Sequence, residues 1–215
     1  VPLQIAGAEI TTAILAEGYD PAQPKEAAYR SALASSEQID TALETATQAQ
    51  SNWEKRPIAE RRALLIEVAN EMAKQRGNFI GVMLRDAGKQ VEESDPEISE
   101  AIDFANYYAR TFDTLEDEFA DVEQSAMGVV LVTPPWNFPL AIPAGGVLSA
   151  LMAGNSVIIK PAPETVLTAW HMVNAMWDAG IPRDVLQFVP TTDDEVGRGL
   201  VTDERVNAVI LTGAY

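Results

Sequence analysis

Few side chains in this sequence of 215 residues could do covalent or metal chemistry. It contains no cysteine and a single histidine, His171. Within these residues, disulfides, thiolate nucleophiles, iron–sulfur clusters and zinc sites with cysteine ligands are excluded, as is any metal site that needs two imidazoles. We therefore expect no metal site. We assign His171 to a helix surface or to the core, because no second ligand or nucleophile accompanies it.

Polar groups that could bind a ligand follow short β-branched runs. Asn137 lies in a proline-rich turn, residues 133–139, whose prolines restrict the backbone. An amide held in this way suits a preorganised hydrogen-bond donor, and an ordinary turn asparagine explains it equally well. Lys160 closes the second run; it could reach ribose hydroxyls or a phosphate, or stand in solvent. Thr212 and Gly213 follow the last run, where a glycine lets a ligand approach the backbone.

The elements that must position these residues alternate between strand and helix after residue 125. β-Branched runs occupy residues 128–132, 157–159, 186–189 and 206–211, and helical patterns occupy residues 140–153, 166–179 and 193–201. This alternation predicts a Rossmann-like α/β fold with a parallel sheet. Ligands of such sheets bind at the carboxyl ends of the strands, where the polar groups fall. No G-x-G-x-x-G sequence follows the first strand, so the ordinary dinucleotide fingerprint is absent.

Before residue 125 the spacing of apolar residues predicts four helices. Pro57 opens the second of these helices and Gly77 ends it. We expect Trp53, Trp170 and Trp177 to be core anchors. Residues 92–123 hold 12 acidic residues and one basic residue, a pattern that we interpret as a solvated helix face followed by an acidic loop. The chain then divides into an extended arm (1–36), a helical part (37–125) and the Rossmann-like unit (126–215).

The charge distribution excludes two classes of partner. Fifteen Lys and Arg residues stand against 32 Asp and Glu residues, a net charge of −17 that repels nucleic acid and anionic membrane surfaces. No charged residue lies between Glu123 and Lys160, but prolines and glycines interrupt this run, so we expect no membrane span. The first residues do not have the pattern of a secretion signal. We therefore expect a cytoplasmic protein.

Five motifs occur together in the order and approximate spacing of the aldehyde dehydrogenase superfamily. They are Pro135-Trp136-Asn137-Phe138-Pro139-Leu140, Ala153-Gly154-Asn155-Ser156-Val157, Lys160-Pro161-Ala162, Ala179-Gly180-Ile181-Pro182 and Leu211-Thr212-Gly213. The chain resembles the N-terminal portion of that family from about residue 20 onward. Within the family, residues 97–108 and 186–190 look most like L-glutamate γ-semialdehyde (Δ1-pyrroline-5-carboxylate) dehydrogenases, including those fused in proline-utilisation A proteins.

The resemblance implies roles for individual residues. Asn137 would donate its side-chain N–H to the oxyanion formed when a cysteine thiolate attacks an aldehyde. Lys160 would bond the adenosine ribose of NAD or NADP, which makes residues 126–215 an NAD(P)-binding unit that is incomplete at its C-terminus. The other positions assigned to the cofactor are Pro134, Pro135, Trp136, Ala162, Pro163, Glu164, Gly197, Thr212 and Gly213.

Three departures from the family pattern matter. No cysteine follows the Thr212-Gly213 motif within these residues, so we expect the chain by itself to be inactive. Pro163 stands where NAD-preferring members often have Glu, with Glu164 one place on, which leaves the choice between NAD and NADP open. Ala214 replaces a Ser or Thr that can bond the pyrophosphate.

Alternative functions and partners stay open at this point. The alternatives to glutamate semialdehyde oxidation in proline catabolism are another semialdehyde or aliphatic aldehyde dehydrogenase, and a non-catalytic nucleotide-binding or assembly module. The partners implied are a small aldehyde substrate and either further copies of the chain or the missing C-terminal half. A sheet that ends at Leu211 would leave an unpaired edge, so we expect the isolated chain to self-associate.

Overall fold

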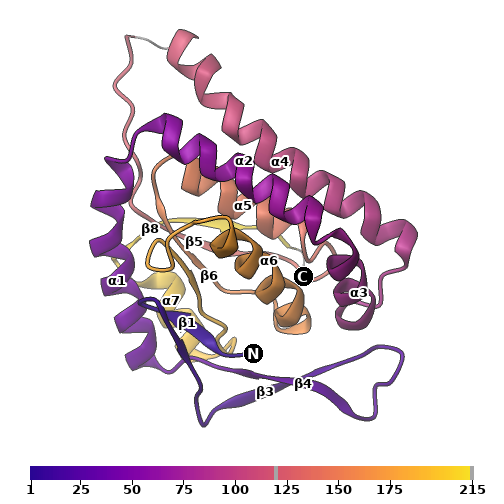
Figure 1. Ribbon diagram of the computed structural model, residues 1–215. Coiled ribbons are helices and arrows are strands. Elements are labelled where there is room, and N and C mark those ends of the chain that lie inside the picture. Colours follow the sequence, from indigo (N-terminus) through magenta and orange to yellow (C-terminus); the bar gives the residue numbers. More distant parts are fainter. Residues whose placement is uncertain (119–120, 214–215) are drawn as a thin grey trace.

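The computed structural model describes residues 1–118 and 121–213 (Figure 1). Six strands form one sheet in the order β2-β1-β7-β6-β5-β8, and two more strands form a separate hairpin, β3-β4. The strands are β1 (Leu3–Ile5), β2 (Ala8–Ile10), β3 (Leu15–Tyr19), β4 (Ala27–Ala32), β5 (Val129–Thr133), β6 (Ser156–Ile159), β7 (Leu186–Phe188) and β8 (Val206–Leu211).

Four neighbouring strands of the large sheet run parallel. β5 pairs in parallel with β6 and with β8, and β6 pairs in parallel with β7. The sheet also contains two antiparallel strands that the sequence pattern did not place there, because β1 pairs with β7 through Gln4 and Phe188 and then with β2. The predicted fold class, a Rossmann-like α/β sheet preceded by helices, is confirmed.

Helices cover both faces of this sheet. They are α1 (Ser36–Glu54), α2 (Ile58–Lys74), α3 (Arg76–Asp86), α4 (Val91–Glu118), α5 (Ala141–Met152), α6 (Val166–Asp178) and α7 (Glu195–Thr202), with a short 3₁₀ turn at Pro163–Thr165. Alternation along β5 explains the two layers, since successive side chains of a strand point to opposite faces. Val130 and Val132 pack in the core beneath α2 to α6, whereas Val129 and Leu131 pack in the core beneath α1 and α7.

The order of the strands creates a switch point. From β5 the chain passes through α5 to β6 and through α6 to β7, always on one face of the sheet. It then crosses the other face through α7, and β8 joins the far side of β5. In open α/β sheets, ligands bind at such a reversal, outside the carboxyl ends of the strands. We therefore expect a ligand-binding site at the carboxyl ends of β5 and β8.

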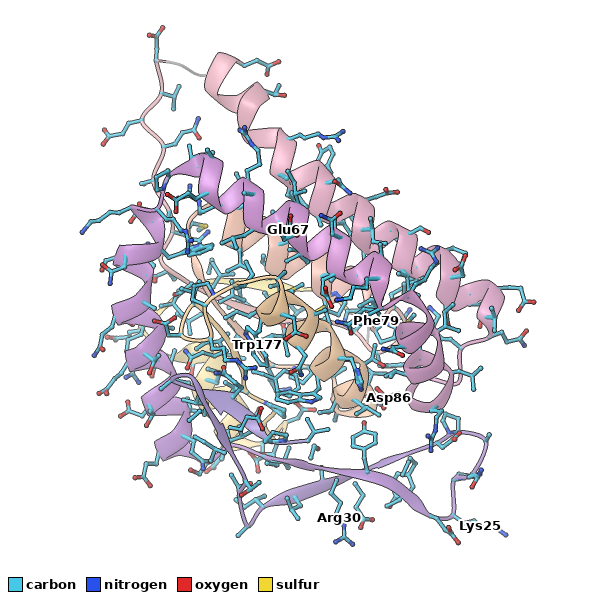
Figure 2. All side chains as sticks on the ribbon, viewed as in Figure 1. Lys25, Arg30, Glu67, Phe79, Asp86 and Trp177 are labelled. Carbon is cyan, nitrogen blue, oxygen red and sulfur yellow. The ribbon has the colours of Figure 1, made fainter. Side chains whose placement is uncertain are left out.

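The N-terminal segment contributes both to the sheet and to a projecting hairpin. Leu3 and Ile5 of β1 are buried in the core. The β3-β4 hairpin extends along the lower edge of the molecule in Figure 1, and in Figure 2 its Lys25 and Arg30 point away from the body. The Tyr29 hydroxyl anchors the hairpin by donating to buried Asp86 at the end of α3 (2.7 Å).

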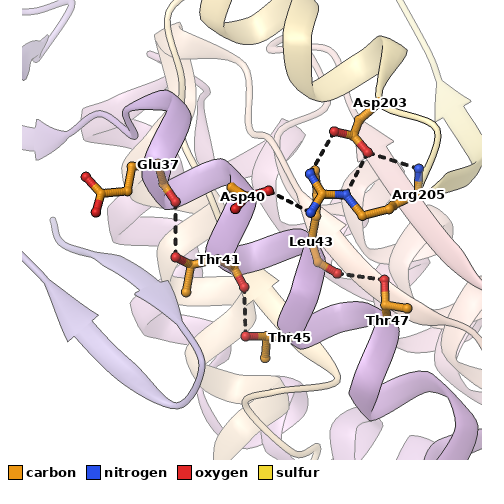
Figure 3. A network of polar contacts seen from close by, with 8 residues as sticks. All are labelled: Glu37, Asp40, Thr41, Leu43, Thr45, Thr47, Asp203 and Arg205. Carbon is orange, nitrogen blue, oxygen red and sulfur yellow. Dashed lines mark hydrogen bonds and ion pairs between the residues drawn. The ribbon is translucent and has the colours of Figure 1, made fainter.

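A network of polar contacts ties the start of β8 to α1 (Figure 3). The Arg205 guanidinium donates to both carboxylate oxygens of Asp203, each at 2.8 Å, and also pairs with Asp40 of α1 at 2.7 Å. The backbone N–H of Arg205 donates to Asp203 as well. These bonds hold the pKa of Asp203 down at about 2. The turn that leads into β8 is therefore fixed to the helix layer beneath it.

Two details of the sequence prediction are wrong. Gly77 does not end the second helix: α2 ends at Lys74, and Gly77 lies inside α3, which begins at Arg76. The break falls at Gln75, two residues before Gly77, and Arg76 at the start of α3 bonds Asp95 and Ser99 of α4. The predicted solvated face of α4 holds for Glu92, Glu93, Glu100 and Asp103, which are exposed, but Glu97 in the same run is only 2% exposed. The division of the chain at residues 36 and 125 stays a prediction.

None of the helices within residues 1–118 and 121–213 combines the length with the apolar character that a bilayer-spanning segment needs.

Candidate functional site

Three of the predicted segments meet at the switch point. Thr133, the last residue of β5, pairs with Leu211 of β8, and the Thr212 N–H donates to the Thr133 carbonyl at 3.3 Å. The Lys160 N–H donates to the Val132 carbonyl at 3.0 Å, which places the end of β6 beside the end of β5. The turn from residue 134, the segment from Lys160 and the Thr212-Gly213 pair therefore leave the sheet side by side.

The proline-rich turn after β5 exposes three consecutive side chains. Pro134 is buried and Pro135 is half-buried, whereas Trp136, Asn137 and Phe138 are exposed. These three residues and residues from α3 to α4 line an open pocket of about 350 Å³; the full lining is Ala87, Gly88, Lys89, Glu93, Trp136, Asn137 and Phe138. The chain thus presents the Asn137 amide at the rim of a cavity. Its role as an oxyanion donor stays a prediction.

Two residues that sequence reasoning did not assign to the site support this turn. Glu97 of α4 accepts the backbone N–H groups of Leu140 and Ala141, at 2.8 and 3.0 Å. Lys89 forms an ion pair with Glu97 and donates to the Asn137 carbonyl at 3.2 Å. Glu97 opens the stretch 97–108 that carried the resemblance to the family, but no spacing rule links it or Lys89 to backbone groups 43 and 48 residues away.

Lys160 does not stand in solvent. Its side chain is 11% exposed, and its ammonium lies 2.5 Å from the Asp193 carboxylate in the turn before α7. An ammonium has three donors, so this ion pair leaves others for a ligand. The exposed carboxylate of Asp193 (65%) and the largely buried ammonium thus form one polar end of the switch-point surface.

The residues after Lys160 form a short 3₁₀ turn with mixed exposure. Ala162 is half-buried, whereas Pro163 and Glu164 are exposed on the surface. Thr165 is buried at the N-cap position of α6, but its side chain makes no capping hydrogen bond. The Glu164 carboxylate is therefore the accessible acidic group closest in sequence to Lys160.

Gly197 is required by a close approach of two backbone segments. A Cβ at this position would lie 2.2 Å from the Thr192 carbonyl oxygen, far inside van der Waals contact. Asp194 caps the same helix by accepting the Val196 N–H at 2.9 Å, and its hydrogen bonds lower its pKa. The glycine thus lets α7 start tightly against the turn that carries Asp193.

The last strand ends in an open position. Thr212 and Gly213 are exposed, and a Cβ at Gly213 would meet no atom within 4 Å. A ligand could therefore approach the backbone here. Ala214, the position of the missing pyrophosphate contact, lies outside the described residues.

Two partly or fully buried titratable groups, His171 and Asp86, do not line the Asn137 pocket. His171 on α6 is half-buried, and burial lowers its pKa. Burial likewise raises the pKa of Asp86, which accepts hydrogen bonds from Tyr29 and from the N–H and hydroxyl of Thr168. Over the described ranges, no cluster of three or more His, Asp or Glu side chains could hold a metal ion. The hydrogen bonds that Asp86 accepts from Tyr29 of the hairpin and Thr168 of α6 give it a structural role.

Comparisons with known proteins identify the family of this chain. The profile of the "Aldehyde dehydrogenase family" matches residues 12–215. The "Bifunctional protein PutA" of Escherichia coli is 38% identical over 195 residues, which cover 91% of this chain and 14% of that protein. The "1-pyrroline-5-carboxylate dehydrogenase" of Staphylococcus haemolyticus is 34% identical over the whole chain, which covers 43% of that protein.

A solved structure shows the same arrangement. The crystal structure of a Thermus 1-pyrroline-5-carboxylate dehydrogenase with bound NAD superposes with a TM-score of 0.89 at 30% identity, over 97% of this chain and 42% of that one. The chain thus spans less than half the length of each of these relatives. The resemblance noted from five sequence motifs is confirmed, and the chain belongs to the aldehyde dehydrogenase family.

Proposed function

We propose that this chain is the NAD-binding part of an aldehyde dehydrogenase that oxidises L-glutamate γ-semialdehyde to glutamate in proline catabolism. The observation that carries the proposal is the convergence of the Asn137 turn, Lys160 and Thr212-Gly213 at one switch point. The choice of aldehyde is supported by relatives that are named 1-pyrroline-5-carboxylate dehydrogenase and PutA and are 33 to 38% identical.

The residues at the switch point fit a nicotinamide dinucleotide. Lys160 keeps donors for a ribose hydroxyl beside its bond to Asp193, and Gly213 leaves its backbone open. The exposed Glu164 could accept from the second ribose hydroxyl and would repel a 2′-phosphate, which favours NAD over NADP. When bound, the cofactor supplies the hydride acceptor. The remaining assigned positions, Pro134 to Trp136 and Ala162 to Pro163, would line its path.

Asn137 is the residue of this chain that we assign to catalysis. Its exposed amide would donate to the oxygen of the aldehyde as negative charge develops there, and the prolines around it would limit reorganisation. The chain contains no cysteine, so the nucleophile must be supplied from outside these 215 residues. We accordingly propose that the chain by itself does not oxidise aldehydes.

The test is an assay of NADH formation by the full-length protein with L-glutamate γ-semialdehyde and with unrelated aliphatic aldehydes. We expect turnover with the semialdehyde, and a loss of about 100- to 1000-fold in Asn137→Ala. Faster turnover of another aldehyde would favour a different dehydrogenase. Tight NAD binding without oxidation of any aldehyde would favour a non-catalytic module. Unchanged turnover in Asn137→Ala would refute the oxyanion role.

A further inference from the structure

The turn that carries Asn137 is held in place by side chains of a different part of the chain. We propose that Lys89 and Glu97 are positioning residues, which fix the backbone of residues 137–141 and so aim the Asn137 amide at the reacting carbonyl oxygen. This inference rests on the proposed function, because it concerns the same catalytic group. Neither residue is expected to touch the substrate's reacting atoms.

Glu97 holds the C-terminal end of the turn. Helix α5 begins at Ala141, and its N-cap residue, Leu140, has no side chain that could accept a hydrogen bond. One carboxylate oxygen of Glu97 accepts both the Leu140 and the Ala141 N–H groups and supplies this missing cap from α4. A negative charge at a helix N-terminus is also favoured by the helix dipole. Glu97 thereby ties the start of α5 to the N-terminal part of a separate helix, α4.

Lys89 holds the turn at Asn137 and Phe138. Its ammonium pairs with the second oxygen of Glu97 at 2.5 Å, and it donates to the Asn137 carbonyl at 3.2 Å. It also lies 4.4 Å from the centre of the Phe138 ring, within range of a cation–π contact. The lysine side chain is only 12% exposed and the Glu97 side chain 1%. Partial burial strengthens these charge-assisted contacts relative to a surface pair.

The two residues together restrain the backbone at the Asn137 carbonyl and at the residues that follow it. Among the described residues, no hydrogen bond restrains the Asn137 amide itself, and the side chain is exposed. Its direction therefore depends on the backbone, which Lys89 fixes at the Asn137 carbonyl and Glu97 fixes three residues later. A misplacement of about 1 Å in such a group can lower a rate about 100-fold. Loss of the contacts that Lys89 and Glu97 make with this backbone should thus lower kcat by a larger factor than it lowers the affinity for the cofactor.

The experiment compares two double variants of the full-length protein. Lys89→Met alone would leave a buried carboxylate unpaired and could unfold the site, so we combine it with Glu97→Gln. The amide oxygen of the glutamine still accepts from the α5 N–H groups, while the contacts to Asn137 and Phe138 are lost. The matched control is Lys74→Met with Glu71→Gln, an ion pair three residues apart on α2 in which the lysine side chain is 75% exposed and the glutamate side chain 19%.

We expect kcat for the aldehyde to fall about 10- to 100-fold in the first double variant, with KM for NAD and the melting temperature near those of wild type. Hydrogen exchange in a peptide that covers residues 136–141 should accelerate, while exchange in β6 stays unchanged. The control should match wild type in every measurement.

Three results would overturn the inference. One is a kcat within about twofold of wild type, and another is unchanged exchange over residues 136–141. A kcat loss accompanied by equal losses in NAD binding and melting temperature would also overturn it, since it would indicate a purely structural role. If wild type oxidised no aldehyde, the proposed function would fail. Hydrogen exchange over residues 136–141 would then decide by itself whether Lys89 and Glu97 position the turn.

Discussion

Replacement of Gly197 by alanine should lower the free energy of unfolding, although alanine is the better helix former. The new Cβ would lie 2.2 Å from the Thr192 carbonyl oxygen, so the two backbone segments would have to separate by about 1.2 Å to reach ordinary contact at 3.4 Å. The atom in the way belongs to the backbone and cannot rotate aside. The displaced turn continues into Asp193, the partner of Lys160. We therefore expect the polar end of the cofactor surface to move as well.

Gly199 supplies a matched control in the same helix. It is exposed, and a Cβ there would meet no atom within 4 Å. Gly199→Ala should therefore show only the gain in helix propensity, about 0.5 to 1 kcal/mol of added stability. Gly197→Ala receives a similar gain but also the overpacking penalty, typically about 1 to 3 kcal/mol. The difference in unfolding free energy between the two variants isolates the contact with Thr192, and we expect it to be about 1 to 3 kcal/mol.

Urea denaturation followed by circular dichroism measures both variants against wild type. The expected order of midpoints is Gly199→Ala above wild type, and Gly197→Ala below Gly199→Ala by the full difference. Equal midpoints for the two variants would refute the reasoning, because they would show that the α7 turn relaxes at no cost.

Three further predictions concern the rest of the fold. Tyr29→Phe should destabilise the chain by about 1 kcal/mol in urea denaturation at neutral pH, because buried Asp86 loses one of its hydrogen bonds; no change would show that the hairpin anchor is unimportant. The Asp203 carboxyl should titrate near pH 2 by NMR, and Arg205→Met should return the midpoint toward 3.8. Since that pKa is lowered in the folded state, its contribution to stability is present above about pH 4 and disappears as the pH falls toward 2, and a midpoint already near 3.8 would contradict this. Light scattering should detect self-association of the isolated chain through the exposed β8 edge, where Leu211 is 71% exposed, and a monodisperse monomer would contradict it.

The spacing of apolar residues after residue 125 predicted the strands and helices there well, because strands and helices each have a characteristic spacing of buried side chains. β8 occurs at the predicted residues 206–211, and α6 begins at the predicted residue 166. The expected core role of Trp53 and Trp177 is confirmed, since both are buried and donate their indole N–H groups to carbonyls of Leu151 and Leu186. These outcomes depend on burial of apolar side chains, which periodicity reports directly.

Contacts between segments that are distant in the sequence could not be predicted from local patterns. β1 is only three residues long, so its place in the sheet depends on pairing with β7 and not on a pattern of its own. Glu97 looked like one more acidic residue of α4, and only the packed structure shows it buried beneath α5. The rule that ligands bind at strand ends located the site. The same rule does not identify Lys89 and Glu97, the residues that hold the site in place.

The burial of Arg61 was likewise not predictable from the sequence. Arg61 is 5% exposed, and its guanidinium donates to the carbonyls of Glu54, Arg56 and Met152, which lie at or near the ends of α1 and α5. A charged residue on a predicted amphipathic helix is ordinarily assigned to solvent. Here the unpaired carbonyls of two helix ends provide its partners, and they come together only in the tertiary structure.

The binding of NAD to this chain tests the central claim most directly, because it needs neither the nucleophile nor the substrate. Calorimetry should detect binding by wild type, about 10- to 100-fold weaker binding by Lys160→Met, which loses a charge-assisted hydrogen bond, and unchanged binding by Lys25→Met on the exposed hairpin loop. Absence of binding by folded wild-type chain, or equal binding by Lys160→Met, would contradict a nicotinamide dinucleotide site at the switch point.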